Sequence, residues 1–178
     1  MPVRIGVISD THGLLRPEAE QCLAGVAHII HAGDIGRPEI IAALRRIAPV
    51  IAIKGNVDTA DWAARYPDAR TIRLGGRSIH ILHDIHELKL DPVRRGIDVV
   101  ISGHSHRPGI ETVDGVLYLN PGSAGPRRFK LPITLATLEL SRSGVRAMVH
   151  GLGSAERARS GRRMRVRGAA GTKPGAGD

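Results

Sequence analysis

Apolar and polar positions alternate in blocks along the first third of the chain. Three continuous apolar runs, at residues 3–9, 27–31 and 49–53, are typical of buried strands. Between them, residues 17–23 and 38–47 carry apolar side chains at helical spacing, and each segment begins with proline, which suits the first turn of a helix. Strands joined through single helices run parallel, because the crossover is right-handed. We therefore expect parallel strands in this part of the chain.

After residue 70 the pattern changes to paired strands joined by tight turns. The turn signals Gly75-Gly76, Asp114-Gly115 and Ser143-Gly144 separate three pairs of runs: 70–74 and 77–82, 110–113 and 116–119, and 133–140 and 145–149. Residues 98–101 add one more continuous apolar strand. Parallel strands followed by hairpins predict an α/β fold with two packed sheets and helices on the outside.

The length and composition fit one soluble domain. A chain of 178 residues with 42% hydrophobic residues can bury roughly two-thirds of the surface that its unfolded form exposes. The sequence shows no signal-peptide pattern and no apolar run of the roughly 18 residues that cross a bilayer, so we expect a cytoplasmic protein without a membrane partner. Cys22 is the single cysteine, which excludes a disulfide framework and a thiolate zinc cluster.

The net charge of +9 is concentrated near the carboxyl terminus. Residues 151–178 hold seven Lys or Arg and two Asp or Glu, a net charge of +5, which leaves +4 for residues 1–150. This Gly/Arg-rich segment lacks apolar periodicity, so it cannot bury enough surface to offset chain entropy. We therefore expect a domain at residues 1–150 and a disordered basic tail at 151–178. Contact of the tail with nucleic acid is the alternative, although the tail has no aromatic residue for stacking.

Polar loops follow the apolar runs at four places. Each loop contains carboxylate, amide or imidazole side chains: Asp10-Thr11-His12, Gly33-Asp34, Gly55-Asn56-Val57-Asp58 and Gly103-His104-Ser105-His106. The carboxyl ends of parallel strands meet at one edge of a sheet, where ligands bind. Oxygen ligands combined with imidazoles suit first-row divalent metals. The sequence therefore favours a metal-dependent enzyme.

Each of these residues has a structural alternative when it is taken alone. Asp10 and Asp34 could cap the helices that follow them. His83 could be a buried histidine at the end of a strand, and His104 and His106 could occupy an exposed turn. The interpretation rests on the order in which the motifs occur, because any single motif is a weak signal.

The ordered set D-x-H, G-D, G-N-x-D, H, G-H-S-H and N-P-G-S, over residues 3–149, resembles the calcineurin-like metallophosphoesterase superfamily, most closely its small bacterial and archaeal phosphodiesterase branch. This resemblance implies a four-layer α-β-β-α sandwich, in which two mixed sheets are flanked by helices. It also implies two divalent metal ions at the carboxyl edge of the sheets. Manganese is the expected metal, and nickel, iron, cobalt and zinc are compatible with the same ligands.

The resemblance assigns roles to seven side chains. They form a first metal site (Asp10, His12, His106), a second metal site (Asn56, His83, His104) and a bridge between the two (Asp34). The implied reaction is phosphodiester hydrolysis, in which a metal-bound hydroxide attacks phosphorus and Asp34, Asn56 and His104 are the catalytic groups. Arg107 and Arg127 are the candidates for binding the phosphate of a small ester substrate. The alternative for Arg127 is an ordinary solvated loop.

Two positions depart from the family pattern. Val57 stands where many relatives have a histidine that assists the leaving group, which favours activated phosphodiesters over phosphomonoesters as substrates. Asp84 replaces the glycine that usually follows the histidine of the fourth motif. This carboxylate either binds a metal or orients a neighbouring imidazole.

A different class of function is also open. The small subunit of the retromer coat has a similar fold and uses it for protein contacts, so the fold alone does not establish catalysis. All seven ligand positions hold residues that can bind metal, which favours an enzyme over such a scaffold. A homo-oligomer is compatible with the sequence, which leaves the oligomeric state open.

Overall fold

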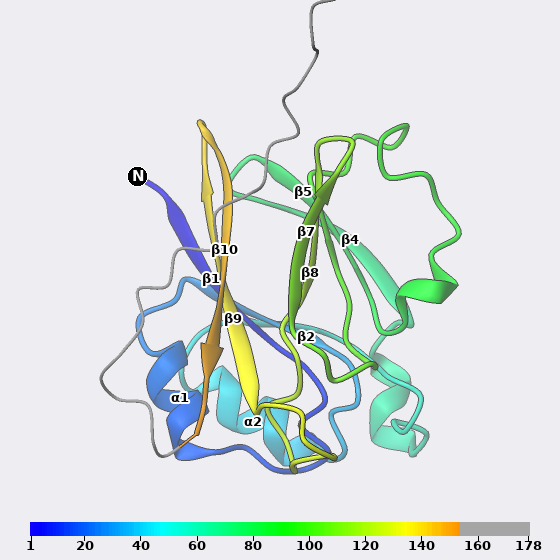
Figure 1. The fold of residues 1–178 in the computed structure, drawn as a ribbon. Coiled ribbons are helices and arrows are strands. Elements are labelled where there is room, and N and C mark those ends of the chain that lie inside the picture. Colours follow the sequence, from blue (N-terminus) through cyan, green and yellow to red (C-terminus); the bar gives the residue numbers. More distant parts are fainter. Residues whose placement is uncertain (154–178) are drawn as a thin grey trace, which may run out of the picture.

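Two five-stranded sheets form the centre of the computed structural model, which describes residues 1–153 (Figure 1). The strand order in the first sheet is β10 (Gly144–Gly151), β9 (Thr134–Ser141), β1 (Val3–Ile8), β2 (His28–Ala32) and β3 (Val50–Ile53). The order in the second sheet is β4 (Ala69–Leu74), β5 (Arg77–Leu82), β6 (Val99–Ile101), β8 (Val116–Asn120) and β7 (Gly109–Val113). The α/β sandwich of two sheets is the fold class that the sequence predicts.

Each sheet is mixed in the way the apolar pattern indicates. In the first sheet β1, β2 and β3 are parallel, and β9 pairs antiparallel with both β1 and β10. In the second sheet β5, β6 and β8 are parallel, and β4 and β7 are antiparallel partners at the two edges. Each sheet therefore has one end at which the carboxyl ends of several strands lie side by side.

Two short helices cover the outer face of the first sheet. The helices α1 (Pro17–Leu23) and α2 (Pro38–Arg45) both begin with proline, and a 3-10 helix, η1 (Asp61–Arg65), follows β3. Leu23 and Leu44 belong to one buried cluster with Ile8 and Ile29 of the sheet. Burying one such side chain contributes roughly 1.5–3 kcal/mol. This contact stabilises helices that are too short to persist in isolation.

Branched aliphatic side chains fill the space between the two sheets. Val7, Ile30, Ile79 and Ile101 are fully buried in this inner cluster. Ile8, the neighbour of Val7, lies in the outer cluster instead, because successive residues of a strand face opposite sides of the sheet. The first run is uncharged from Ile5 to Ile8 because both faces of β1 are buried there.

The outer face of the second sheet is covered mainly by an irregular segment, residues 84–97, which includes the 3-10 helix η2 (Ile85–Glu87). A third apolar cluster lies between this segment and the sheet. Its buried members are Leu82, Ile97, Val100 and Val116, and Ile85, Leu88, Leu90 and Tyr118 pack partly buried against them. Pro92 and Gly96 interrupt the segment and disfavour a continuous helix. The fourth layer expected from the family resemblance is therefore present chiefly as irregular chain.

The last strand ends two residues before the end of the described chain. β10 includes Gly151, and the Leu152 N–H donates to the carbonyl of Ile133 at 2.8 Å. Because Leu152 is also buried, the folded part extends beyond the boundary at residue 150 that composition suggests. The prediction of a disordered basic tail falls mostly on residues 154–178, which lie outside the described residues. Within residues 1–153, no helix has the length and apolarity needed to cross a bilayer.

Candidate metal centre

The polar loops of the two sheets meet at one end of the sandwich. In the first sheet, Asp10 and His12 follow β1, Asp34 follows β2 and Asn56 follows β3. In the second sheet, His83 follows β5, and His104 and His106 follow β6. The two sets are in contact, because Asp34 Oδ1 of the first lies 3.3 Å from His83 Nε2 of the second. All seven predicted ligands therefore lie at the carboxyl ends of strands, and both sheets contribute to the site.

Backbone strain is concentrated at these residues. Five of the seven have a left-handed φ: Asp10 at 54°, His12 at 45°, Asp34 at 54°, His104 at 67° and His106 at 58°. Such a conformation costs a residue with a Cβ about 1–3 kcal/mol and is found mainly at functional sites. Among the described residues, only Asp114, in a hairpin turn, and Phe129 share it without being glycine. The strain marks the same loops that the sequence motifs single out.

One group of side chains joins Asp10, His12 and His106. Asp10 Oδ1 lies 3.3 Å from His106 Nε2 and 4.0 Å from His12 Nε2. The two imidazole Nε2 atoms are 3.4 Å apart. Asp10 Oδ2 faces the other way and accepts hydrogen bonds from the Ser9 hydroxyl and from the backbone N–H of His104. This group has the membership expected for the first metal.

A second group joins Asp10, Asp34 and His83. His83 Nε2 lies 3.3 Å from Asp34 Oδ1 and 3.9 Å from Asp10 Oδ1. The other ring nitrogen, Nδ1, donates to the carbonyl of Ala32 at 2.8 Å, which leaves Nε2 as the ligand atom. Desolvation works to lower the pKa of His83, but the adjacent Asp34 carboxylate outweighs it and raises the pKa.

Asn56 and His104 lie beside this second group instead of inside it. His104 Nδ1 is 3.1 Å from Asn56 Oδ1, and the His104 ring is 5.2 Å from the ring of His83. The family resemblance places Asn56 and His104 with His83 around one metal, and among the carboxylates and imidazoles the tight group around His83 contains Asp10 and Asp34. Asn56 and His104 are therefore adjacent to each other, and the His104 ring lies next to the ring of His83.

Asp34 lies between the two groups. Its Oδ2 atom is 3.7 Å from His12 Nε2, and its Oδ1 atom is 3.3 Å from His83 Nε2. Desolvation works to raise the pKa of Asp34, but the adjacent His83 ring and the hydrogen bond from the Val57 N–H lower it. The carboxylate is therefore ionised at neutral pH, with one oxygen directed toward each group. A bridging ligand requires this arrangement.

The ligand atoms of the site are better suited to binding a metal than to hydrogen bonding with one another. Asp10 Oδ1 and His83 Nε2 are both buried and have no hydrogen-bond partner within the described residues. A buried polar atom without a partner costs about 1–3 kcal/mol, and a charged one costs more. Carboxylate oxygens mixed with imidazole nitrogens are the ligands that first-row divalent cations accept. The residues present therefore fit divalent metal ions.

Asp84 orients imidazoles from outside the two groups. Its Oδ1 atom accepts from the backbone N–H of His86 at 3.0 Å and contacts His86 Nδ1 at 2.9 Å. Its Oδ2 atom lies 3.7 Å from His104 Nε2. Of the two roles that the sequence left open for Asp84, these contacts favour orientation of His104 over direct binding of a metal.

The N-P-G-S motif supports the loops from behind. Asn120 Nδ2 donates to the carbonyl of Gly103 at 2.8 Å, which holds the start of the G-H-S-H loop. Ser123 Oγ donates to the carbonyl of Asp10 at 3.0 Å. The motif therefore connects the loop after β6 with the loop after β1.

Asp58 is a functional candidate that the sequence motif contains without revealing its role. Its buried carboxylate accepts three backbone N–H groups, from Ile35 at 3.0 Å, Gly36 at 2.9 Å and Gly55 at 2.8 Å. One side chain thus ties the Asp34 loop to the Asn56 loop. In the sequence Asp58 is visible only as the last residue of the G-N-x-D motif. Its role is hidden there, because two of its three partners, Ile35 and Gly36, are more than twenty residues away.

A neutral histidine links the first two loops beneath the site. The Gly33 N–H donates to His31 Nδ1 at 3.2 Å, so Nε2 carries the proton and donates to Thr11 Oγ1 at 2.9 Å. The Thr11 hydroxyl in turn donates to the carbonyl of Ile35 at 2.9 Å. Burial lowers the pKa of His31 to about 4, although Asp58 and Asp10 act in the opposite direction.

Acid is expected to destabilise the metal-free protein through His31. Its pKa falls from 6.5 in the unfolded chain to about 4 in the fold, so only the unfolded state binds the proton between these values. Stability is fully present above pH 6.5 and decreases by about 3 kcal/mol as the pH falls to about 4. Urea unfolding of His31→Gln should show a shallower loss over this range than the native chain, and an equally steep loss would contradict the assignment.

Arg128, the neighbour of Arg127, is exposed like the two arginines proposed for substrate binding. Arg107 and Arg127 are exposed, and within residues 1–153 neither guanidinium forms a hydrogen bond with the ligand groups. Burial lowers the pKa of His12, and the charge of Arg128 lowers it further against the opposing effect of Asp34. The sequence did not distinguish Arg128 from Arg127.

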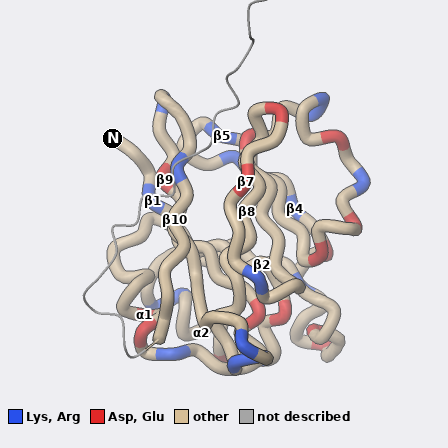
Figure 2. The backbone as a smooth tube through the Cα atoms, in the orientation of Figure 1, with Lys and Arg blue, Asp and Glu red and all other residues tan. Residues whose placement is uncertain are grey.

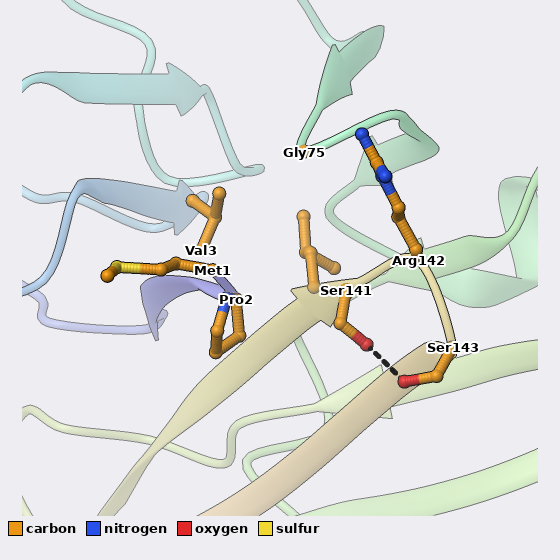
Figure 3. Close-up of a pocket in the computed structure, with 8 residues that line it drawn as sticks. Met1, Pro2, Val3, Gly75, Ser141, Arg142 and Ser143 are labelled. Atoms are coloured by element: carbon orange, nitrogen blue, oxygen red, sulfur yellow. Dashed lines mark hydrogen bonds between the residues drawn. The ribbon is translucent and has the colours of Figure 1, made fainter.

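A hollow of about 630 Å³ lies at the opposite end of the sandwich (Figure 3). It is formed by the chain before β1, where Met1 and Pro2 lie, and by the turns at Gly75 and Ser143. No carboxylate or imidazole side chain is among the described residues that line it. The hollow therefore offers no second candidate for a metal centre.

The fold and the ligand groups together define a phosphoesterase of the metal-dependent type. Residues 3–143 match the model of the calcineurin-like phosphoesterase superfamily domain. The chain therefore belongs to this family of metal-dependent hydrolases.

Three known proteins illustrate the relationship. A probable metallophosphoesterase of Methanothermobacter thermautotrophicus is 36% identical over 131 residues, which cover 67% of this chain and 76% of that protein. The solved structure of a novel archaeal phosphodiesterase has a TM-score of 0.69 at 27% identity, covering 83% of this chain and 99% of that one. Vacuolar Protein Sorting 29 of Cryptosporidium parvum has a TM-score of 0.69 at 18% identity, covering 84% and 97%, which shows a shared fold alone.

Proposed function

We propose that this protein is a dinuclear metal-dependent phosphodiesterase that acts on small phosphodiesters. The observation that carries the proposal is the pair of carboxylate–imidazole groups that share Asp10, with Asp34 directed toward both. When bound, two divalent cations would polarise the phosphate oxygens and lower the pKa of the attacking water. Manganese is the metal we propose, and nickel, iron, cobalt or zinc would suit the same atoms.

The residues of the chain supply position and charge in this proposal. Asp10 is held rigidly, because one of its oxygens accepts hydrogen bonds from Ser9 and His104 and leaves the other for metal. Asn56 contributes a neutral oxygen where a further carboxylate would add excess negative charge. His104 contacts that oxygen and is oriented by Asp84. The exposed cation of Arg128 attracts an anionic substrate to the same end of the molecule.

A diester is the preferred substrate because of Val57. Its backbone N–H donates to Asp34 Oδ1 at 3.1 Å, so the residue lies at the site, but its side chain cannot protonate a leaving group. Esters with a stable leaving group need little protonation. An archaeal relative of known structure is a phosphodiesterase, which supports the same substrate class.

The competing function is that of a scaffold without catalysis. The similarity to Vacuolar Protein Sorting 29, at 18% identity, extends to the fold alone. Protein contacts do not require buried carboxylate and imidazole atoms that lack partners, such as Asp10 Oδ1 and His83 Nε2. These atoms favour the enzyme.

The test is reconstitution of the metal-stripped full chain. Manganese, nickel, zinc or magnesium is added, metal content is measured, and rates are compared for bis(p-nitrophenyl) phosphate and p-nitrophenyl phosphate. We expect two metals per chain and a kcat/KM for the diester at least about tenfold above that for the monoester, a difference of about 1.4 kcal/mol in transition-state stabilisation. A faster monoester reaction, or a rate independent of metal, would contradict the proposal.

A further inference from the structure

The loop between β8 and β9 packs directly against the metal centre. Ala124 donates its backbone N–H to the carbonyl of Ser9 at 3.1 Å. Gly125 lies so close to the loop after β1 that a Cβ at this position would stand 2.4 Å from the carbonyl oxygen of Asp10. Residues 126–131, which we call the rim loop, leave from this contact and therefore begin at the edge of the site.

The rim loop is cationic. Arg127, Arg128 and Lys130 are all exposed on it. Figure 2 shows basic segments on this loop, at the same end of the molecule as acidic segments of the neighbouring loops. Because the rim loop leaves from the contact with Asp10, a phosphate group at the metal centre would have cationic side chains on the adjoining loop.

Phe129 stands in the middle of this cationic loop. It is the only phenylalanine in the chain, and its exposed fraction is 91%. Its φ of 53° is in the left-handed region, which is unusual for a bulky residue. The turn is closed by a hydrogen bond from the Leu131 N–H to the carbonyl of Arg128 at 3.2 Å.

Neither the exposure nor the strain of Phe129 helps the protein to fold. Burying the phenylalanine would stabilise the fold, and relaxing its left-handed backbone would relieve strain. An aromatic ring that is strained and exposed at the edge of a site is well placed to bind a ligand. Among the described residues, the other aromatic side chains, Trp62, Tyr66 and Tyr118, pack against apolar clusters.

We propose that the rim loop recognises the part of the substrate that does not react, with Phe129 stacking on a planar ring and Arg128 pairing with the phosphate. The substrates are then nucleotide-type phosphodiesters, in which a base is attached through a sugar to the scissile phosphate. Stacking tolerates any base, since every base has a π-face. This inference rests on the proposed phosphodiesterase function and specifies its substrate class.

The first test measures binding to the metal-loaded full chain by calorimetry. The probes are a nucleoside 5′-monophosphate and methyl phosphate, which share a phosphate and differ in the ring. Phe129→Ala should reduce the preference for the nucleotide by about tenfold, the loss expected from one stacked base. Phe129→Tyr should restore the preference, and Phe129→Leu should not. Arg128→Gln should weaken both ligands in parallel.

The second test compares hydrolysis of two diesters with the same leaving group, thymidine 5′-p-nitrophenyl phosphate and methyl p-nitrophenyl phosphate. Phe129→Ala should lower the ratio of their kcat/KM values by about tenfold. Met148→Ala, which removes an exposed apolar side chain from β10, is the matched control and should leave the ratio unchanged.

The outcomes separate this inference from the proposed function. If Phe129→Ala leaves both ratios unchanged, or weakens both ligands equally, ring recognition by Phe129 is wrong while the phosphodiesterase function stands. If no metal form hydrolyses either diester, the proposed function is wrong, and the binding ratio still decides whether Phe129 recognises a ring.

Discussion

Asp34→Asn is expected to abolish metal binding and hydrolysis together. The Asp34 carboxylate has one oxygen 3.7 Å from His12 Nε2 and the other 3.3 Å from His83 Nε2, so it faces both ligand groups. The amide would replace one anionic oxygen with an NH2 group that cannot bind a cation. Loss of a residue that merely supports a ligand lowers metal affinity by about 10–100-fold. Loss of the shared anion should exceed about a hundredfold.

The measurement is metal content by mass spectrometry after dialysis, together with kcat/KM on an activated diester. Asp98→Asn is the matched control, because Asp98 pairs with Arg77 and accepts the Ser78 N–H away from the site. The control should retain its metals. If Asp34→Asn retained two metals per chain at near-native rates, Asp34 would not be a bridge.

The elements of the fold could be predicted because their signals are local. Proline marks the first residue of α1 and of α2, and continuous apolar runs mark strands that are buried on both faces. The position of the polar loops follows from the same signals, since a loop after a parallel strand must lie at its carboxyl end. The prediction of a helical layer on the second sheet was less accurate, because the segment that covers this sheet, residues 84–97, is mostly irregular.

The distances between the side chains of the site could not be predicted in the same way. His83 lies close to Asp10 and Asp34, and Asn56 contacts His104. These distances depend on how the two sheets pack across the core. No local pattern in the sequence encodes that packing.

The supporting residues were missed for a similar reason. Asp58 accepts N–H groups from a loop more than twenty residues earlier in the chain. The position of Arg128 depends on the conformation of the rim loop, which includes a left-handed Phe129. A side chain that acts through distant backbone atoms appears in the sequence only as a single polar residue, without a recognisable motif.

Asp58→Ala is expected to destabilise the metal-free protein strongly. Three backbone N–H groups, from Ile35, Gly36 and Gly55, would lose their acceptor. A hydrogen bond to a charged group contributes about 1.5–3 kcal/mol, and a buried donor left unpaired costs about 1–3 kcal/mol. We therefore expect the free energy of unfolding in urea to fall by at least about 3 kcal/mol.

The same change should reach the metal centre even when the chain folds. The Asp58 carboxylate holds the Asp34 loop against the Asn56 loop, so its removal lets both ligands move away from His83 and His104. Asp58→Asn keeps the shape and one acceptor oxygen, and should show a smaller loss of stability with measurably weaker metal binding. Asp68→Ala is the control, because Asp68 is exposed and pairs only with Lys54 at the surface. A loss of stability in Asp58→Ala no larger than in this control would show that the two loops are held together by other contacts. The strained conformation of Asp34 would then have to be maintained by its own hydrogen bond from Val57 and by the packing of Gly55 against it.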